Sequence, residues 1–400
     1  MILQNSLDFF AILQHICKMK RYLYNQILED LKHKMVFITG PRQVGKTYIS
    51  KQILNEFETP QYLNFDNIFD RKIITEMSWK LNTDLLVFDE IHKLKNWKLF
   101  LKGIFDSKPK NQSILVTGSA RLETFRQSGE SLAGRYLHLH LNPFSVKELK
   151  SLVTPYEAIE TLNKYGGFPE PLLYALNNNK NSSLEFAARW KNQYYTDLIR
   201  EDIFEYSRIS EIHTMKHLLE LLRNRVGSPI SYKALSEDLQ VSPNTVKKYV
   251  QILESLYIIF LIRPFHKNIA RAILKEPKVY FYDTSYVNGN EGIKFENTCA
   301  VSLLKHVQFL SDTKGKNIQL NYLRNKEKKE IDFVIVENGQ PTFFIEVKLS
   351  NKKLSPSLIY FSKQFIKTKA IQLVHNLRQE ENKNGIELLR AADWFAKLSA

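Results

Sequence analysis

Short apolar runs, each bounded by polar residues, recur along the chain after Lys34. The segments between them are long enough to form helices, and this alternation is typical of a mostly parallel sheet with helices on both faces. The last run alternates strictly between apolar and polar residues, so we expect it to be an edge strand with one solvated face. The predicted strands are Met35–Thr39, Tyr62–Phe65, Leu85–Phe88, Ile114–Thr117 and Tyr136–Leu141.

The middle of the chain has a helical pattern in place of the apolar runs. Ser242 is a suitable N-cap residue, with Pro243 at the first helical position, and this pair marks the start of one helix. Two helices joined by a short turn and followed by an apolar strand form a winged-helix pattern. We expect helical structure in 145–176 and 184–206, then helices at 211–225, 231–239 and 245–256 and a strand at 258–262.

The pattern changes again after Pro277, where a strand at 278–282, a helix at 294–307 and a hairpin around Asn338 and Gly339 predict a further α/β domain. The fold class expected for the whole chain is therefore α/β. We expect five parts, which are an N-terminal extension 1–18, an α/β core 19–145, a helical connector 146–208, a winged helix 209–270 and a C-terminal domain 271–400.

Composition narrows the classes of protein that these elements can build. The 400 residues are too many for one ordinary core, and 44% hydrophobic with 25% charged residues is typical of a folded, water-soluble protein. The two cysteines, Cys17 and Cys299, cannot form a disulfide framework or a zinc cluster, which favours a reducing, cytoplasmic environment. The longest apolar stretch, 256–262, is too short to cross a bilayer, and the N-terminus lacks the basic region of a secretory signal, so we expect no membrane association.

The chain carries 57 Lys and Arg residues against 42 Asp and Glu residues, which leaves a net charge of +15. Such an excess favours a polyanionic partner, either nucleic acid or nucleotide, because binding neutralises phosphates and releases counterions. A Lys-rich composition also raises solubility, and net charge alone does not separate these two explanations.

Residues 40–47 read Gly-Pro-Arg-Gln-Val-Gly-Lys-Thr and lie between a predicted strand and a predicted helix. This is the P-loop pattern, in which glycines let the backbone wrap phosphates with its N–H groups pointing inward. Lys46 would reach the β- and γ-phosphates of ATP, and the Thr47 hydroxyl would bind Mg²⁺. The expected nucleotide-binding residues are Gly40, Pro41, Arg42, Gln43, Val44, Gly45, Lys46 and Thr47.

A second motif follows about forty residues later, where the apolar run Leu85–Phe88 leads into Asp89 and Glu90. The end of a buried strand would hold Asp89 near Mg²⁺, and Glu90 would polarise the attacking water. An apolar run followed by two acidic residues is common on its own. Paired with the P-loop, it predicts a site that hydrolyses ATP as well as binding it.

The strand at 114–117 ends in Gly118 and Ser119. In ATPases with a catalytic Glu beside the Asp, the strand between the P-loop strand and the Asp strand carries a polar residue that contacts the γ-phosphate or the water. We expect Ser119, with Thr117 as the less favoured alternative, to have this role, although an ordinary turn serine would look the same. Arg135 is expected to stabilise phosphate charge in cis or on a neighbouring subunit, with a surface salt bridge as the alternative.

A second group of charged residues lies near the C-terminus. The strand period of two puts Glu346 and Lys348 on one face, and Asp332 lies on the preceding strand. Metal-dependent nucleases use two carboxylates to hold Mg²⁺ against the scissile phosphate and a lysine to stabilise or orient the attacking water. Glu296 would complete the metal site, and Glu330 lies close by in the sequence. The same pattern also suits a solvated hairpin face, so an active nuclease, a nuclease-like fold for binding or regulation and an unrelated α/β domain all stay open.

Asp332 and Glu346 can share a metal ion only if they lie opposite each other across the hairpin. The sum of their positions is even, which requires an odd number of loop residues, for example 338–340. A two-residue turn at 338–339 without a bulge would pair Asp332 with Ile345 and turn its side chain to the other face.

The predicted helix 245–256 would be the recognition helix of the winged helix. Winged helices in ATPases also act as rigid lids or docking surfaces, and two lysines are a modest footprint for DNA, so both roles stay open. The candidate DNA contacts are Asn244, Lys247, Lys248 and Gln251.

Several motifs occur together in a fixed order, and in that order they resemble the prokaryotic AAA-type ATPases that carry a C-terminal domain of unknown function related to restriction-endonuclease folds. The likeness covers about residues 20–380. It implies an AAA-like ATPase core, a winged helix and a nuclease-like end with a D…ExK signature at Asp332, Glu346 and Lys348. The motifs are GPRQVGKT, LLVFDEIHKL followed by Trp97, LVTGSA, SLAGR, LNPFSVKEL and GGFPEPL.

The function expected from the sequence is that of an ATP-binding and ATP-hydrolysing protein that acts on or with DNA or RNA, with a Mg²⁺-dependent nuclease at its C-terminal end. The alternative is an ATP-dependent regulatory switch or protein-interaction scaffold whose C-terminal domain is catalytically silent. The basic charge and the carboxylates favour the first function, and the modest recognition helix favours the second. AAA-type cores often assemble, so a homo-oligomer or a protein partner is a further expectation.

Overall fold

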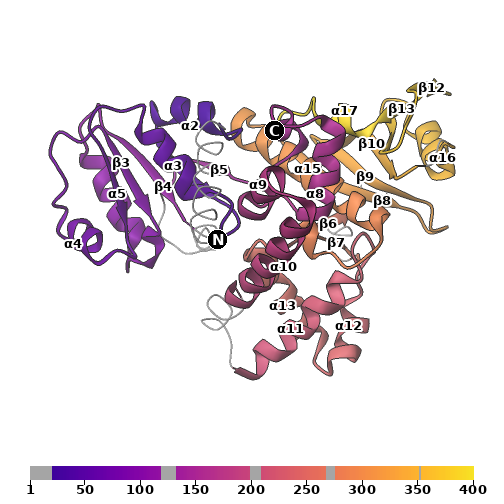
Figure 1. Ribbon diagram of the computed structural model, residues 1–400, viewed down its shortest axis with the longest axis horizontal. Helices are drawn as coiled ribbons and strands as arrows, with labels where there is room; N and C mark the ends of the chain where they lie inside the picture. Colours follow the sequence, from indigo (N-terminus) through magenta and orange to yellow (C-terminus); the bar gives the residue numbers. More distant parts are fainter. Residues whose placement is uncertain (1–19, 119–131, 199–208, 267–274, 351–352) are drawn as a thin grey trace. The chain divides into compact units, whose positions relative to one another are not determined.

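The computed structural model describes residues 20–118, 132–198, 209–266, 275–350 and 353–400. The chain divides into two compact units, residues 1–142 with 255–257 and residues 143–254 with 258–400 (Figure 1). The expected α/β class is confirmed. The predicted N-terminal extension 1–18 and Ser119 lie outside the described residues.

The first unit is built on a sheet in which every neighbouring pair of strands is parallel. All of the predicted strands are present, and the alternating run at 136–140 forms an edge strand as expected. The strand at 113–117 lies between the P-loop strand and the Asp89 strand. The strands are β1 Met35–Thr39, β2 Pro60–Asn64, β3 Leu85–Asp89, β4 Ser113–Thr117 and β5 Tyr136–His140, in the order β2-β3-β4-β1-β5.

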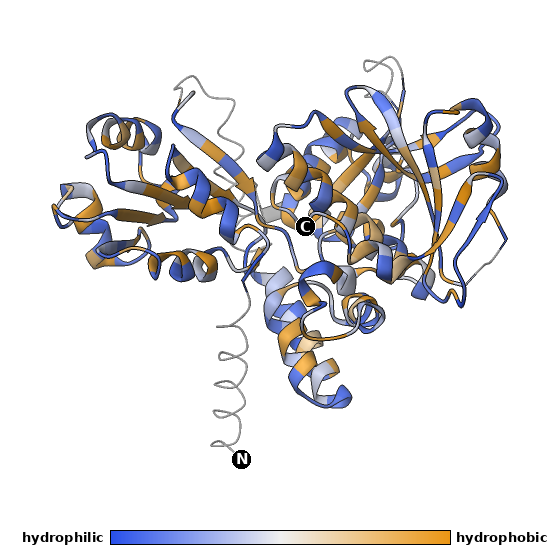
Figure 2. Ribbon diagram, turned by 90° about the horizontal axis from the view of Figure 1, so that it is seen from above, coloured by the Kyte–Doolittle hydropathy of each residue, from blue (hydrophilic) through white to orange (hydrophobic). Residues whose placement is uncertain are grey.

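Helices pack on the two faces of this sheet because its buried strands are apolar on both sides (Figure 2). Met35 and Phe37 of β1 share a buried cluster with residues of α4 and α5. Val36 and Ile38 point to the opposite face, where α2 and α3 lie (Figure 1). The helices are α2 Tyr24–Leu31, α3 Lys46–Leu54, α4 Ile68–Glu76 and α5 Trp97–Ser107.

The second unit begins with helices. A capping box starts α8, since Thr154 and Glu157 each accept a hydrogen bond from the other's backbone N–H. The Ser242 hydroxyl accepts the Thr245 N–H at 3.1 Å, so this residue caps α13 as the sequence suggests. None of the described helices combines the length and apolar composition that crossing a bilayer requires. The helices are α7 Val146–Leu149, α8 Pro155–Tyr165, α9 Pro169–Asn177, α10 Lys180–Asp197, α11 Ile209–Arg223, α12 Tyr232–Leu239 and α13 Pro243–Ser255.

An eight-stranded mixed sheet forms the rest of the second unit. The strand β6 was expected to end the winged helix, but it pairs antiparallel with β7 and parallel with β8. The expected domain boundary at residue 270 therefore falls inside one sheet, because β6 supplies hydrogen bonds to both of its sides. The strands are β6 Ile259–Pro264, β7 Lys278–Phe281, β8 Ile318–Arg324, β9 Glu330–Glu337, β10 Gln340–Lys348, β11 Lys369–Val374, β12 Glu381–Lys383 and β13 Ile386–Arg390, in the order β12-β13-β11-β10-β9-β8-β6-β7.

Buried polar contacts fix the long helix α15, Glu291–Lys314, which extends beyond the predicted 294–307 at both ends. The fully buried Asn297 accepts the Phe281 N–H at 2.8 Å and donates to the Phe281 carbonyl at 2.9 Å, which ties α15 to β7. The buried Lys305 pairs with Glu148 of α7. Helices α16, Pro356–Gln364, and α17, Ala391–Phe395, complete the unit, and α16 packs Leu358 and Phe361 on the sheet.

Asp283 is a buried carboxylate that makes stability depend on pH. Its side chain accepts the Ser285 N–H at 3.0 Å, and burial raises its pKa to about 6. Because this folded-state pKa lies above the ordinary value of 3.8, the stability that the group contributes is complete below about pH 4 and is lost as the pH rises through about 6.

We expect Asp283→Asn, which keeps the oxygen acceptor and removes the charge, to be more stable than the wild type by about 3 kcal/mol at pH 8 and similar to it at pH 4. Urea unfolding of both proteins at the two pH values measures this difference. An advantage of the same size at both pH values would contradict the assignment of a raised pKa to Asp283.

Candidate nucleotide site and carboxylate cluster

The P-loop connects β1 to α3, and its backbone conformation requires glycine. Gly40 has a φ of 147°, and a Cβ atom there would lie 2.2 Å from the Leu141 carbonyl oxygen. Gly45 has a φ of 99° and precedes the first residue of α3, so it turns the chain into the helix. Gln43 also has a positive φ, of 56°. The turn leaves the first N–H groups of α3 at the loop, where phosphate groups bind in such structures.

Lys46 curls back over this loop. Its ammonium group donates to the carbonyl oxygens of Gly40 at 2.9 Å and Pro41 at 2.6 Å, and the residue is buried. Arg21, which was not among the predicted site residues, supports the loop by donating a hydrogen bond to the Val44 carbonyl at 2.7 Å. Arg21 belongs to no motif, so only the fold reveals its contact with a residue 23 positions away.

The Asp89 carboxylate accepts hydrogen bonds from hydroxyl groups on three neighbouring segments. Thr47 donates to Oδ2 at 2.8 Å and Thr117 donates to Oδ1 at 2.6 Å. Tyr62, which the sequence analysis did not identify, donates to Oδ2 from β2. The contact from Thr117 shows that the less favoured residue of β4 reaches Asp89, while Ser119 lies outside the described residues.

These groups fit the magnesium ion that a P-loop implies. Hydroxyl and carboxylate oxygens are the ligands that Mg²⁺ prefers in proteins. The Thr47 hydroxyl and the Asp89 carboxylate are in direct contact, so both can reach one ion between them and the phosphates. Asp89 is buried, which excludes competing water from the charged group.

Glu90 follows directly and has a left-handed backbone, with a φ of 56°. Its N–H donates to the Thr117 carbonyl at 3.0 Å, which holds the turn against β4. Burial raises the pKa of Glu90, and the positive charge of Lys46 opposes this shift. Glu90 therefore lies within electrostatic reach of the P-loop lysine. His92, another residue that no motif indicated, has its Nδ1 atom 3.5 Å from a Glu90 oxygen.

Arg135 lies far from this constellation. Its carbonyl accepts the N–H of Met35, the first residue of β1, whereas the P-loop follows the last residue of that strand. The guanidinium makes two hydrogen bonds to Asp106, at 2.8 and 3.0 Å. Arg135 therefore lies roughly 13 Å from the P-loop, at the other end of β1, and forms the surface salt bridge that was the alternative expectation. A role on a neighbouring subunit stays a prediction.

The C-terminal hairpin places Asp332 opposite Glu346 by an unexpected route. Its turn has only two residues, Asn338 and Gly339, which alone would give the wrong register. A bulge follows, since Pro341 pairs with Val336 but Phe343 pairs with Ile335. The last pair in this register is Ile345 with Phe333. One further residue along each strand puts Asp332 opposite Glu346. Asp332 accepts the Val347 N–H at 2.9 Å.

Glu296, Glu330, Asp332 and Glu346 form the carboxylate cluster. Glu346 is the most buried of these four carboxylates, at 5% exposure. Lys348 donates to its Oε1 atom at 2.8 Å, its buried Oε2 atom has no partner within hydrogen-bond distance among the described residues, and Ser355 is close enough to lower the pKa of the carboxyl. Burial and the neighbouring Asp332 raise the pKa of Glu346 to about 7. The same two causes raise the pKa of Glu296 to about 7. An unpartnered carboxylate oxygen beside Asp332 suits a cation with oxygen ligands.

A three-carboxylate cage is not formed. Among the described residues, no group of three or more His, Cys, Asp or Glu side chains is arranged to hold a metal ion. Glu296, expected to complete the cage, instead accepts the Tyr280 hydroxyl at 2.8 Å and lies 3.8 Å from the Lys278 ammonium. Lys278, which the sequence analysis missed, is buried and pairs with Glu330 at 2.6 Å. Burial lowers the pKa of Lys278, but the surrounding carboxylates more than reverse this and raise it overall.

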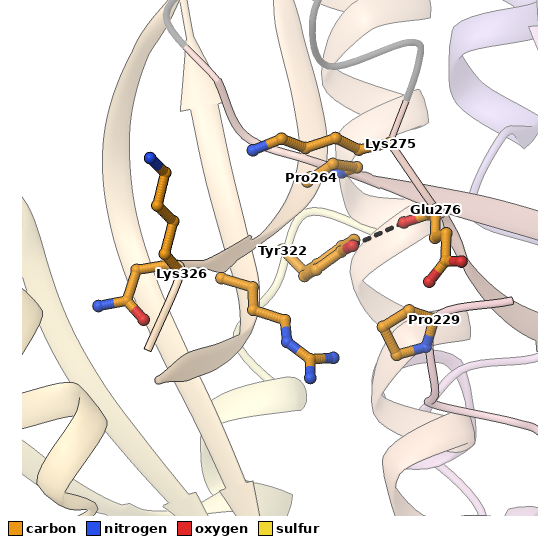
Figure 3. Close-up of a pocket in the computed structure, with 8 residues that line it drawn as sticks. Pro229, Pro264, Lys275, Glu276, Tyr322 and Lys326 are labelled. Atoms are coloured by element: carbon orange, nitrogen blue, oxygen red, sulfur yellow. Dashed lines mark hydrogen bonds between the residues drawn. The ribbon is translucent and has the colours of Figure 1, made fainter. Parts of the chain in front are cut away.

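A cationic pocket of about 400 Å³ adjoins the cluster (Figure 3). Glu330 links the two, because it pairs with Lys278 and also lies 3.4 Å from Arg324 in the pocket wall. The Tyr322 hydroxyl donates to the Glu276 carbonyl at 2.6 Å, and Lys275 and Lys326 extend on the other side of the ring (Figure 3). The pocket is lined by Pro229, Pro264, Lys275, Glu276, Tyr322, Arg324, Asn325 and Lys326.

Three protein families match successive parts of the chain. Residues 32–150 match the AAA domain family, which covers the whole P-loop constellation. Residues 156–296 match a domain of unknown function (DUF8612), and residues 291–394 match another (DUF4143). The last match contains Glu296, Asp332 and Glu346.

Relatives of this chain occur in distant prokaryotes. An uncharacterized protein of Methanocaldococcus jannaschii is 27% identical, over 81% of this chain and 79% of its own length. An uncharacterized protein of Mycobacterium tuberculosis is 24% identical, over 81% of this chain and 72% of its own length. One of Haemophilus influenzae is 22% identical, over 90% of this chain and 93% of its own length. The likeness to these relatives runs through both compact units.

Solved structures match more weakly. The Thermotoga maritima RuvB Holliday junction branch migration motor is 16% identical, over 60% of this chain and 89% of its own, with a TM-score of 0.29. A Pyrococcus horikoshii signal transduction ATPase with numerous domains is 14% identical, over 74% of this chain and 48% of its own, with a TM-score of 0.30. The family match and the P-loop geometry support an AAA-type ATPase domain in residues 32–150, and two regions that match domains of unknown function follow it.

Proposed function

We propose that the chain binds ATP with Mg²⁺ and hydrolyses it at the site formed by the P-loop, Asp89 and Glu90. The observation that carries this proposal is the Asp89 carboxylate, which contacts Thr47 of the P-loop and Thr117 of β4. A structural aspartate at a strand end would have no reason to meet the P-loop hydroxyl that binds magnesium in ATPases.

Each side chain has a distinct task in this site. Lys46, held over the loop by two carbonyl oxygens, would transfer its hydrogen bonds to the β- and γ-phosphates. Thr47 and Asp89 would hold Mg²⁺, which neutralises the charge that develops on the phosphates. Glu90 would accept a proton from the attacking water, and its partly buried carboxylate is a better base because its pKa is raised.

We expect Lys46→Ala to abolish ATP binding and Glu90→Gln to bind ATP but release phosphate at least 100-fold more slowly, an effect of the size seen when a general base is removed. Calorimetric titration with ATP and a phosphate-release assay measure the two quantities. Glu76→Gln at the exposed end of α4 is the matched control and should behave as the wild type. Unchanged turnover in both site variants would refute the assignment.

A second function is favoured by the bulge that brings Asp332 opposite Glu346. We propose that the C-terminal unit acts on the phosphodiester backbone of DNA or RNA in a Mg²⁺-dependent, nuclease-like manner. Asp332 and Glu346 would hold the ion, and Lys348 would orient the attacking water. Glu346 Oε2, buried beside Lys348 and without a partner among the described residues, supports this role.

The charge around this cluster suits a polyanionic strand. Lys275, Arg324 and Lys326 line the pocket, and Arg324 lies 3.4 Å from Glu330. On α13, the four candidate DNA contacts are all exposed, so the winged-helix segment can offer a second contact to a strand. The alternative is a regulatory switch or scaffold in which the same carboxylates only stabilise the fold through Lys278 and Lys348.

Incubation with DNA and RNA, in Mg²⁺ or Mn²⁺ and with or without ATP, separates these functions. We expect the wild type and Lys46→Ala to cleave nucleic acid and Asp332→Ala to lose at least 100-fold in rate, because one of two metal-binding carboxylates is gone. Glu387→Gln on the exposed face of β13 is the matched control. Absence of cleavage in every protein and condition would favour the switch or scaffold.

A further inference from the structure

A second and larger cavity lies in the second unit, and neither proposed reaction uses it. Its volume is about 690 Å³, within the range of small-molecule sites in proteins. It is lined by α8, by the first residues of α10 and α15, and by the residues that follow β10 and β11. The side chains that carry the inference are Tyr156, Asn163, Lys164, Lys180, Lys294 and His375.

His375 forms part of the cavity wall and is 3% exposed. Its ring stacks parallel to Tyr156, with 4.7 Å between the centroids and 3° between the planes. Its Nε2 atom bonds to the Glu160 carboxylate. A carboxylate accepts, so Nε2 carries the hydrogen, and in the tautomer with its hydrogen on Nε2 alone the Nδ1 atom has a lone pair. Nδ1 is buried and has no hydrogen-bond partner among the described residues.

Asn163 contributes a second acceptor of the same kind. Its Oδ1 atom is buried and lacks a hydrogen-bond partner in the described part of the chain. A buried acceptor without a donor is unfavourable and rare in folded proteins. Two of them in the wall of one cavity need donors, which ordered water or a ligand with N–H or O–H groups supplies.

The cavity also attracts negative charge. Lys164, Lys180 and Lys294 line it, and none of them forms an ion pair with a described residue. The N-terminal ends of α10 and α15, which carry partial positive charge, open onto the same space. The lining also contains two carboxylates, Glu160 and Glu291, so the three lysines outnumber the acidic side chains by one.

We propose that this cavity binds a nucleotide unit whose base carries an exocyclic amino group. The phosphate would lie among the three lysines, and the amino group and a further N–H or O–H of the nucleotide would donate to Asn163 Oδ1 and His375 Nδ1. The stacked rings of Tyr156 and His375 form an apolar wall for the base. The unit is either a free mononucleotide or the phosphorylated end of a nucleic-acid strand, and both present the same chemistry.

This site is separate from the P-loop and is joined to the carboxylate cluster through the backbone. The His375 N–H donates to the Lys348 carbonyl at 3.0 Å, and the Asn376 N–H donates to the Leu349 carbonyl at 2.9 Å. The cavity floor is therefore the end of β10, the strand that carries Glu346. A nucleotide held there would contact the segment that positions Lys348.

The test uses the full chain with Lys46→Ala, which removes ATP binding at the P-loop, and nucleoside monophosphates, which lack the β- and γ-phosphates that a P-loop recognises. CMP and UMP form the ligand pair, because they differ in an amino group against a carbonyl. Calorimetry should show one CMP bound per chain and at least tenfold weaker binding of UMP. A 5′-phosphorylated oligocytidylate tests the strand end.

Asn163→Leu, which removes one acceptor, and Lys294→Gln, which removes one charge, should each weaken CMP or oligocytidylate binding at least tenfold. Lys363→Gln on the exposed part of α16 is the matched control and should leave binding unchanged. Thermal unfolding of each variant verifies that it is folded. Binding of CMP assigns a free nucleotide, and binding of the oligocytidylate alone assigns a strand end. Absence of binding by both ligands at millimolar concentration, or binding that neither variant weakens, overturns the proposal.

Discussion

The contact between Asp89 and the hydroxyl groups around it joins the segments that form the nucleotide site of the first unit. This carboxylate is 3% exposed, so it is stable in the fold only if its oxygens accept hydrogen bonds or bind a cation. Its partners Tyr62 and Thr117 lie on the two strands that flank β3, and Thr47 follows β1. Parallel strands with matched register end at one edge, and the order β2-β3-β4-β1 therefore assembles the site.

The local sequence was sufficient to predict those residues of this site that belong to a single motif. Gly40, Gly45 and Lys46 follow from one loop whose backbone demands those residue types, and Asp89 follows from the end of one apolar strand. Tyr62 and Arg21 could not be predicted in the same way, because each contributes one long-range contact and neither residue type is unusual at its position. Arg135 could have been placed from its position, because it directly precedes a predicted strand, and the start of a strand in a parallel sheet lies at the edge opposite the P-loop.

The carboxylate cluster shows the same limit for a β-hairpin. The turn at Asn338 and Gly339 can be predicted from sequence, whereas the bulge that corrects its register has Pro341 as its one signal, because proline in a central strand occurs mainly at bulges. Lys278 could not be predicted either, because the sequence does not distinguish a buried lysine from an exposed one before the fold places its carboxylate partners around it. Its charge offsets part of the repulsion among Glu296, Glu330 and Asp332, which would otherwise destabilise a buried acidic group.

Burial is the common element of the two sites. In both, carboxylates lie where water is scarce, and the pKa values of Glu90, Glu296 and Glu346 are raised mainly for that reason. Raised pKa values are frequent at functional sites, although structural ion pairs produce them as well. The catalytic interpretation therefore depends on the geometry around Asp89 and Asp332.

The most direct test of the account is the magnesium dependence of ATP binding in Asp89→Asn. The amide keeps the shape of the side chain and one acceptor but lacks the charge that a magnesium ligand needs. Titration with ATP in the presence and absence of Mg²⁺ should show that the ion tightens binding at least tenfold in the wild type and has little effect in the variant. An equal effect of Mg²⁺ on both proteins would contradict the claim that Asp89 and Thr47 hold the ion.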